Sequence, residues 1–341
     1  MKASVFAEAF FIYFYQVNLE KKIFAISSPE EFNTVALEVF QFQYKNVKVY
    51  REFCDLLKID PSKITNVKDI PFLPIQFFKS HQIIPESFTS EKMFSSSGTT
   101  GTTTSKHFIA NLSLYQESFF KAFEYFFGSS EEMTILALLP SYLEQGNSSL
   151  VFMVDELIKQ SNSSHSGFYL DNTSDLIDKL EFLEKTKQKT ILLGVSYALL
   201  DLMEEKQFQL KNTIIMETGG MKGRRKEMIK EELHALLKNG FGVNEIYSEY
   251  GMTELLSQAY SKGNGIFNCP PWMKIITRDT EDAQSYINEK TGGINVIDLA
   301  NLYSCSFIAT QDLGKKSIDQ SFEILGRFDD SDIRGCNLMV F

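Results

Sequence analysis

The chain has 341 residues, of which 43% are hydrophobic and 23% charged, and its net charge at pH 7 is −10. This length is sufficient for a large core and for two lobes. Because acidic residues outnumber basic ones, the composition argues against a protein that binds DNA or RNA, and an anionic substrate has to meet local positive charge.

No segment of the sequence is typical of a membrane span. The most apolar run near the start, Val5 to Val17, contains Glu8 and is too short to cross a bilayer. It also lacks the small-residue cleavage site of a secretory signal. We therefore expect a cytoplasmic protein with no integral membrane segment.

The four cysteines and four histidines are scattered, with no CxxC or HxxxH spacing, so a structural zinc site is not expected. In a reducing cytosol, Cys54, Cys269 and Cys305 are interpreted as small buried apolar residues.

The first strong helix signal is a capping box formed by Ser28, Pro29 and Glu31, with proline at the first helical position. Apolar residues then recur at helical spacing from Phe32, which predicts one amphipathic helix running towards Leu57. The proline-punctuated aromatic segment from Pro71 to Lys79 is expected to be an extended strap that packs in the core.

Later segments alternate between apolar strands and longer helical stretches, which is typical of an α/β protein. The predicted strands are Met133 to Pro140, Thr190 to Ser196 and Asn212 to Thr218. The predicted helices are Asp175 to Lys187, Leu199 to Phe208, and Arg224 to Lys238 closed by Gly240. From Ile294 onward strand-like pieces dominate, which suggests a smaller β element packed on the main sheet.

The stretch "SSSGTTGTTTSK", Ser95 to Lys106, is rich in hydroxyl side chains and has two glycines and one cation. Backbone N–H groups in such a turn can converge on a phosphate, while hydroxyls add donors and lysine adds charge. It matches neither the Walker A loop nor GxGxxG. A solvated Ser/Thr linker has a similar composition, so the stretch alone leaves both interpretations open.

Four motifs together resemble the adenylate-forming acyl-activating superfamily, which couples ATP to carboxylic acids. The loop resembles its phosphate loop, and "YSEYGMTE" (Tyr247 to Glu254) resembles its Y-G-x-T-E signature. "TQDLG" (Thr310 to Gly314) is similar to its ribose motif with Gln311 in place of glycine, and "LGRFDDSDIRG" (Leu325 to Gly335) to its hinge motif. The motifs follow the family's order.

The resemblance implies roles for individual residues around bound ATP. Glu254 is the expected Mg²⁺ ligand, Thr253 donates to the α-phosphate, and Asp312 accepts from the ribose hydroxyls. Arg327 and Lys106 stabilise phosphate charge and, with Glu254, make up the expected catalytic groups. The expected nucleotide-binding residues also include Ser97, Gly98, Thr99, Thr100, Gly101, Gly219, Gly220, Tyr250 and Gly251. Read outside the motifs, Glu254 is an ordinary acid at a helix start and Asp312 an ordinary turn residue.

Substrate-side assignments follow from weaker likeness. "LLPSYLEQG" resembles the family stretch that lines the carboxylate pocket, with Tyr142 as its wall. His165 could face the same pocket, although a lone histidine is more often a satisfied surface or core residue.

Nearly the whole chain resembles the acyl-protein synthetase branch of this superfamily, which is related to phenylacetate CoA ligases. The likeness includes "PFLPIQFFKS", "NVIDLAN" and "SDIRGCNLMVF". It implies that Cys336 accepts the acyl group as a thioester before passing it to a partner such as an acyl reductase. The residues alone favour a Cys336 that fills space in a buried terminal strand, and only the family resemblance favours the acceptor role.

The sequence thus predicts an α/β fold like the N-terminal domain of adenylate-forming enzymes: mixed sheets flanked by helices, with a smaller β element near the C-terminus. The expected divisions are residues 1–90, 91–293 and 294–341, without the usual C-terminal lobe and its lysine. The predicted activity is ATP- and Mg²⁺-dependent activation of a carboxylic acid, with a fatty acid as the expected substrate, followed by acyl transfer to Cys336 and on to a partner. Two alternatives stay open: an acyl- or aryl-CoA ligase that uses CoA as acceptor, and a non-catalytic nucleotide-binding scaffold.

Overall fold

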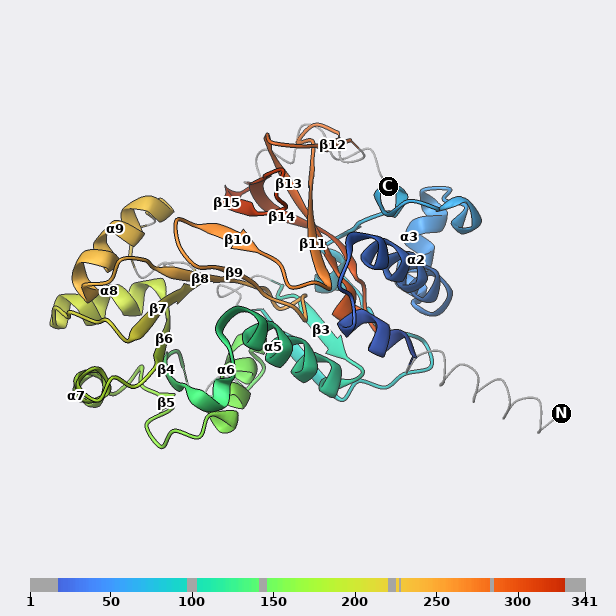
Figure 1. The fold of residues 1–341 in the computed structure, drawn as a ribbon. Coiled ribbons are helices and arrows are strands. Elements are labelled where there is room, and N and C mark those ends of the chain that lie inside the picture. Colours follow the sequence, from blue (N-terminus) through green and yellow to red (C-terminus); the bar gives the residue numbers. More distant parts are fainter. Residues whose placement is uncertain are drawn as a thin grey trace, which may run out of the picture.

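The computed structural model describes residues 18–96, 103–140, 146–219, 225–226, 228–282 and 285–328. One 13-stranded sheet organises this part of the chain, in the order β12-β11-β13-β14-β15-β10-β9-β8-β7-β6-β4-β5, with β1 pairing beside β14. Strands β5, β4, β6, β7 and β8 are parallel, and the path from β8 to β12 is antiparallel. The sheet is therefore mixed, as the sequence predicts (Figure 1).

The parallel strands are β4 Thr134–Leu138, β5 Gly167–Phe168, β6 Thr190–Val195, β7 Thr213–Thr218 and β8 Tyr247–Tyr250. The other strands of the sheet are β1 Leu73–Pro74, β9 Ala259–Ser261, β10 Ile266–Asn268, β11 Met273–Arg278, β12 Tyr286–Ile287, β13 Thr291–Asp298, β14 Phe307–Lys316 and β15 Phe322–Arg327. A separate antiparallel hairpin pairs β2 Lys92–Ser95 with β3 Lys106–Ile109.

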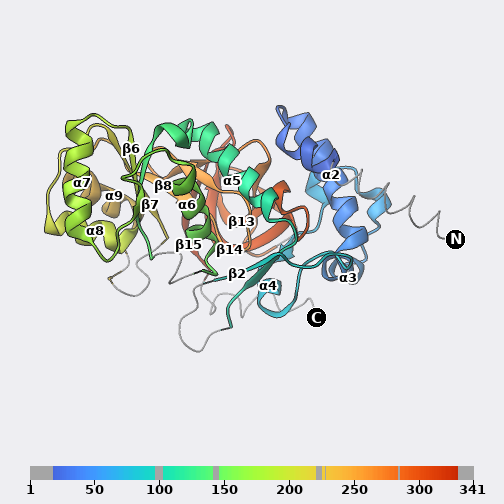
Figure 2. The ribbon, with the colours of Figure 1, turned by 90° about the horizontal axis from the view of Figure 1, so that it is seen from below.

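Helices flank the sheet at both ends. They are α2 Pro29–Asn46, α3 Lys48–Leu56, α4 Phe77–Ser80, α5 Leu112–Phe127, α6 Ser149–Gln160, α7 Thr173–Lys185, α8 Ser196–Glu205 and α9 Lys230–Phe241. Short 3₁₀ turns cover Pro61–Lys63, Val67–Asp69, Ser130–Glu132 and Leu299–Asn301. Helices α7, α8 and α9 gather at the parallel end, while α2 and α3 lie at the opposite end (Figure 2).

The three predicted buried strands are confirmed as β4, β6 and β7. The single helix predicted from Ser28 towards Leu57 is wrong in one respect. It divides into α2 and α3 at Val47, whose extended backbone (φ −100°, ψ 99°) interrupts the helical path. The Ser28 cap is present, but the Glu31 carboxylate binds the backbone N–H of Ser27 instead of that of Ser28.

The predicted end of α9 at Gly240 is also wrong. Helix α9 continues to Phe241 and is capped by Gly242 in the left-handed conformation (φ 66°). Gly240 instead lies against Met203 of α8, where an added Cβ would collide with the methionine side chain. Its role is close helix packing, which the sequence does not distinguish from a stop signal.

The C-terminal β element differs from the prediction in how it attaches. Strands β13, β14 and β15 do not pack on the face of the main sheet; they extend it, because β15 hydrogen-bonds to β10. The strap at Pro71 to Lys79 is extended only at β1 and then turns into the short helix α4. Cys54 and Cys305 are buried as expected, whereas Cys269 is partly exposed.

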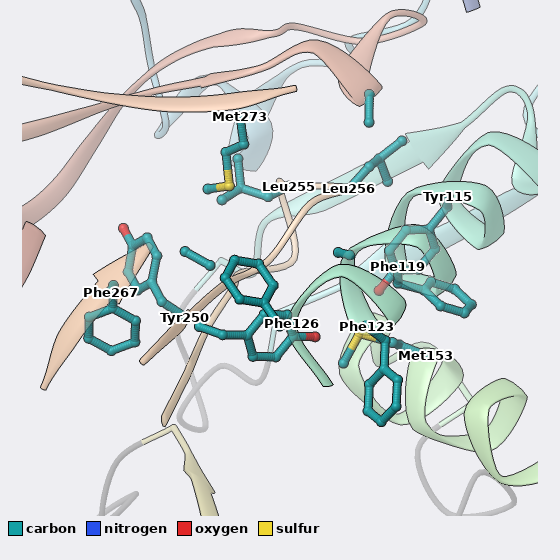
Figure 3. Packing of buried hydrophobic residues seen from close by; sticks show 14 of the residues in the cluster. Tyr115, Phe119, Phe123, Phe126, Met153, Tyr250, Leu255, Leu256, Phe267 and Met273 are labelled. Atoms are coloured by element: carbon teal, nitrogen blue, oxygen red, sulfur yellow. The ribbon is translucent and has the colours of Figure 1, made fainter. Parts of the chain in front are cut away.

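The core lies between α5, α6 and the middle of the sheet (Figure 3). Tyr115, Phe119, Phe123 and Phe126 recur on one face of α5, and the Phe126 ring lies 5.2 Å from that of Tyr260 on β9. The same cluster includes Leu255, which follows the Y-G-x-T-E stretch. Packing of large apolar side chains therefore holds that stretch against the core. Every helix within the described ranges is too short or too polar to cross a bilayer.

Candidate active site

Three predicted motifs meet at the end of strand β8. Tyr250 is the last residue of β8, and its hydroxyl donates a 2.7 Å hydrogen bond to Asp312 Oδ2 on β14. Arg327 on β15 is the register partner of Asp312, and its Nε donates to Asp312 Oδ1 over 2.9 Å. The structure thus brings together three predicted residues from different motifs.

The Asp312 carboxylate is buried, while the Arg327 side chain is 75% exposed. Burial and the neighbouring Asp312 carboxylate hold the pKa of Tyr250 well above its usual range, so the phenol stays protonated and donates. The Tyr250 ring packs edge-on to Phe322 at 5.7 Å. Gln311 occupies an ordinary strand position with no left-handed backbone, so glutamine in place of the motif's glycine leaves Asp312 within β14, in register with Arg327.

Glu254 is buried, with 6% of its surface exposed. Burial raises the pKa of its carboxyl above the ordinary value, while a hydrogen bond from Ser105 and the positive charge of Arg327 oppose the shift. A carboxylate buried in this way is suited to a cation or a charged ligand. Gly251 and Thr253 lie between Tyr250 and Glu254, in the segment after β8.

Two acids lie near the ends of β7 and β8. Glu249 accepts a 2.5 Å hydrogen bond from the Thr218 hydroxyl, yet burial and the nearby Glu217 raise its pKa to about 7. Burial would raise the pKa of Glu217 too, but a hydrogen bond with His234 and the positive charge of Lys230 lower it to about 2. The Lys230 Nζ lies 3.0 Å from Glu217 Oε1. Neither acid was predicted from the sequence, because their environment depends on strand pairing.

Gly219 directly follows β7 and adopts a left-handed backbone (φ 67°), which favours glycine. Its carbonyl accepts a 3.0 Å hydrogen bond from the Ser196 hydroxyl at the start of α8. Gly251 is constrained in another way, because an added Cβ there would collide with Glu249 Oε1. Both glycines therefore have steric reasons to be glycine at this edge of the sheet.

Strand β3 contacts the segment that follows β8. His107 is fully buried, and its Nδ1 lies 2.8 Å from the Thr253 carbonyl oxygen. Lys106, the preceding residue, is exposed, as alternation along a strand requires. Lys106 is the first residue of β3 and lies between Ser105 and His107 in the sequence.

A second layer holds the segment after Glu254. Asp298 accepts hydrogen bonds from the backbone N–H groups of Leu256 (2.7 Å) and Ser257 (2.9 Å), and Asn301 donates 2.7 Å to the Glu254 carbonyl. Burial raises the pKa of Asp298 to about 6, although these bonds oppose the shift. Both residues belong to the stretch "NVIDLAN", whose function the sequence alone did not reveal.

Arg278 on β11 is another missed residue. Its guanidinium donates to the Thr310 carbonyl at 2.6 Å and to Asn295 Oδ1 at 2.6 Å, so it fixes the strand that carries Asp312. Burial lowers the pKa of Arg278 to about 10, which leaves it charged at neutral pH. A single arginine with no local motif gives no sequence signal for such a contact.

Several predicted residues lie outside the described residues: Ser97, Gly98, Thr99, Thr100, Gly101, Gly220, Tyr142 and Cys336. His165, the weaker pocket candidate, is partly exposed and its ring lies 5.2 Å from that of Phe182 on α7. That contact indicates a packing role for His165, which is typical of a lone histidine.

The sequence was compared with models of known protein families. The model of the family described as "Acyl-protein synthetase, LuxE" matches residues 19–341. The chain belongs to the LuxE family. The motif resemblance to acyl-protein synthetases is therefore confirmed, and with it the assignment to a family of ligases.

A curated relative is the long-chain-fatty-acid–luciferin-component ligase of Photorhabdus luminescens. It is 35% identical over 68 residues, which make up 20% of this chain and 58% of the relative. The aligned region thus spans less than two thirds of that relative.

Solved structures share the fold. A 2-hydroxyisobutyryl-CoA ligase in complex with 2-HIB-AMP and CoA aligns with a TM-score of 0.64 at 12% identity, covering 89% of this chain and 72% of that one. ATP-bound MatB from Rhodopseudomonas palustris aligns with a TM-score of 0.52 at 16% identity, covering 69% of this chain and 47% of MatB. The LuxE-family chain therefore has the adenylate-forming ligase fold, which confirms the predicted fold class.

Proposed function

We propose that this protein activates a carboxylic acid with ATP and passes the acyl group through Cys336 to a partner protein. In the first step the carboxylate oxygen attacks the α-phosphorus of ATP, the bond to the β-phosphate bridging oxygen breaks, and acyl-adenylate and pyrophosphate form. The observation that carries the proposal is the Tyr250–Asp312 hydrogen bond, because it joins two nucleotide motifs 62 residues apart in the sequence at one sheet edge.

The nucleotide-binding roles follow from this arrangement. Asp312 is proposed to accept from the ribose hydroxyls, Tyr250 and the Gly219–Gly220 pair to flank adenine, and Thr253 to donate to the α-phosphate. The exposed guanidinium of Arg327, held by Asp312, is free to reach a phosphate or ribose oxygen at the same edge. Lys106 and the Ser97 to Gly101 loop are proposed to hold the remaining phosphates.

Glu254 fits a Mg²⁺ ligand. Its carboxyl is buried beside Ser105, and Mg²⁺ is commonly held by one or two carboxylates together with substrate phosphates and water. When bound, the ion would neutralise phosphate charge during attack on the α-phosphorus. Glu254 then contributes by holding a hard oxygen at a fixed place, while Asn301 and Asp298 restrain the backbone around it.

The second step is proposed to use Cys336. Its thiolate attacks the acyl carbonyl carbon of the adenylate, the bond between that carbon and the AMP phosphate oxygen breaks, and a thioester and AMP result. Thiolates attack activated acyl groups readily, and thioesters remain reactive enough to hand the acyl group on. An acyl reductase is the kind of partner that would accept the acyl group. The transfer leaves Cys336 as a free thiol again.

A fatty acid is the proposed substrate class. The name of the Photorhabdus luminescens relative specifies a long-chain fatty acid, and the likeness to that protein supports the same class here. The CoA ligases of the same fold favour one alternative, in which the thiol of CoA replaces Cys336 as acceptor. A scaffold without turnover is the alternative of another kind.

The proposal is tested by incubating the purified protein with MgATP and radiolabelled carboxylic acids in the absence of CoA, then separating it on a denaturing gel. We expect protein-bound label that requires ATP, is released by neutral hydroxylamine and disappears in Cys336→Ser. Matched controls are Cys54→Ser and Cys305→Ser, which change two other thiols, both of them buried. Label that persists in Cys336→Ser would refute the acceptor, and a CoA ligase would turn over with CoA in that variant.

A further inference from the structure

His107 stands out because its environment is costly for a histidine. The ring is fully buried, Phe78 packs edge-on against it at 5.4 Å, and among the described residues its Nε2 has no hydrogen-bond partner. An unpaired buried nitrogen is unfavourable, and a phenylalanine would fill the same space without it. What histidine adds is the single bond from Nδ1 to the Thr253 carbonyl.

The direction of that bond is fixed by chemistry. A carbonyl oxygen only accepts, so the Nδ1 of His107 carries the hydrogen and donates it. The bond crosses 146 residues of sequence and ties β3 to the peptide that precedes Glu254. Because β3 belongs to the two-stranded sheet and β8, which leads into the Y-G-x-T-E stretch, to the 13-stranded sheet, the bond links two sheets.

Ser105 supplies a second contact to the same peptide, because side chains alternate between the two sides of an extended segment. Side chains at positions 105 and 107 of an extended segment lie on one side, and position 106 on the other. Ser105 lies close enough to the Glu254 carboxyl to oppose the rise in its pKa, and the Nδ1 of His107 donates to the backbone carbonyl of the preceding residue. Both are buried, whereas Lys106 between them is exposed. Consecutive residues 253 and 254 thus face two alternate residues, Ser105 just before β3 and His107 within it.

We propose that His107 is a positioning residue for Glu254, which holds the Thr253–Glu254 peptide against β3 so that the carboxylate is pre-set for a divalent cation on the nucleotide. This inference rests on the proposed function, because it assumes that Glu254 takes part in MgATP binding. It assigns a role in that site to a residue outside the Y-G-x-T-E motif. Ser105 is the second contact to the same peptide.

The test compares two substitutions at one position. His107→Asn keeps an amide donor close to the place of Nδ1, whereas His107→Phe keeps the ring and its packing on Phe78 but removes the donor. His81→Phe is the matched control, since His81 also stacks on a phenylalanine, at 5.1 Å from Phe77, but is exposed. Should His107→Phe fail to fold, His107→Gln removes the donor from the Nδ1 position while staying polar.

The readout is ATP affinity by titration calorimetry, with and without Mg²⁺, rather than turnover. For wild type and His81→Phe we expect Mg²⁺ to strengthen ATP binding; in His107→Phe this strengthening falls about tenfold, and His107→Asn restores it to within about threefold. Metal-free ATP affinity stays within twofold throughout. An equal Mg²⁺ effect in His107→Phe, or loss of metal-free binding as well, would overturn the positioning role. Absence of MgATP binding by the wild type would instead refute the proposed function.

Discussion

Replacing Glu249 by glutamine is predicted to make the protein more stable, and increasingly so as the pH rises. The Glu249 carboxyl has a pKa of about 7 in the folded protein, against an ordinary value of 4.5, because burial and the nearby Glu217 disfavour its charged form. The folded state therefore binds a proton more tightly than the unfolded state does. Stability from this group is fully present below pH 4.5 and is lost as the pH rises through about 7.

The size of the effect follows from the shift in pKa. A difference of about 2.5 units corresponds to about 3 kcal/mol at pH 8.5, of which about 1.4 kcal/mol is already lost at pH 5.5. Glutamine is neutral at every pH and its amide oxygen can still accept from the Thr218 hydroxyl, which donates to Glu249 Oε2. The advantage of Glu249→Gln over wild type should thus grow by about 2 kcal/mol between pH 5.5 and 8.5.

The assay is urea unfolding followed by circular dichroism at several pH values. Glu217→Gln is the matched control: its folded pKa of about 2 is depressed, so its stabilisation is lost only as the pH falls below 4.5 towards 2. Because the charge of Glu217 also helps to raise the pKa of Glu249, that control should be less stable than wild type by an amount that shrinks as the pH rises from 5.5 to 8.5. A difference between Glu249→Gln and wild type that does not change with pH, or that favours wild type at pH 8.5, would refute the reasoning.

Three further substitutions test the packing and the site. Asp298→Ala leaves the N–H groups of Leu256 and Ser257 without their acceptor and should lower the free energy of unfolding by about 2–4 kcal/mol in urea; a loss under 1 kcal/mol would contradict this. Gly240→Ala should lower it by about 1–3 kcal/mol, despite alanine's higher helix propensity, because Cβ meets the α8 side chain; a more stable variant argues against close packing. Tyr250→Phe removes the donor to Asp312 and should raise the KM for ATP about 3- to 10-fold in pyrophosphate exchange; an unchanged KM would show that the bond is not needed.

The sequence predicted those parts of the site that local motifs carry. Tyr250, Glu254, Asp312 and Arg327 each lie in a short recognisable stretch, and the structure brings three of them into direct contact. The buried strands were predicted well because continuous apolar runs such as Thr190–Val195 have few other uses.

What the sequence did not predict depends on contacts between distant segments. The bond from His107 to Thr253 spans 146 residues, and the acceptor role of Asp298 follows from where β13 ends beside the segment after Glu254. Gly240 was taken for a helix stop because close packing on α8 leaves the same glycine in the sequence. Val47 breaks the first helix with no proline or glycine to mark it.

The central claim is that this protein forms acyl-adenylate, and acid-dependent exchange of labelled pyrophosphate into ATP tests it most directly. The protein is incubated with MgATP, labelled pyrophosphate and a series of fatty acids, beside Glu254→Gln as the matched variant. The account predicts that label enters ATP only when an acid is present and that Glu254→Gln lowers the rate at least a hundredfold. Wild-type protein that binds ATP but exchanges no label with any acid would contradict it.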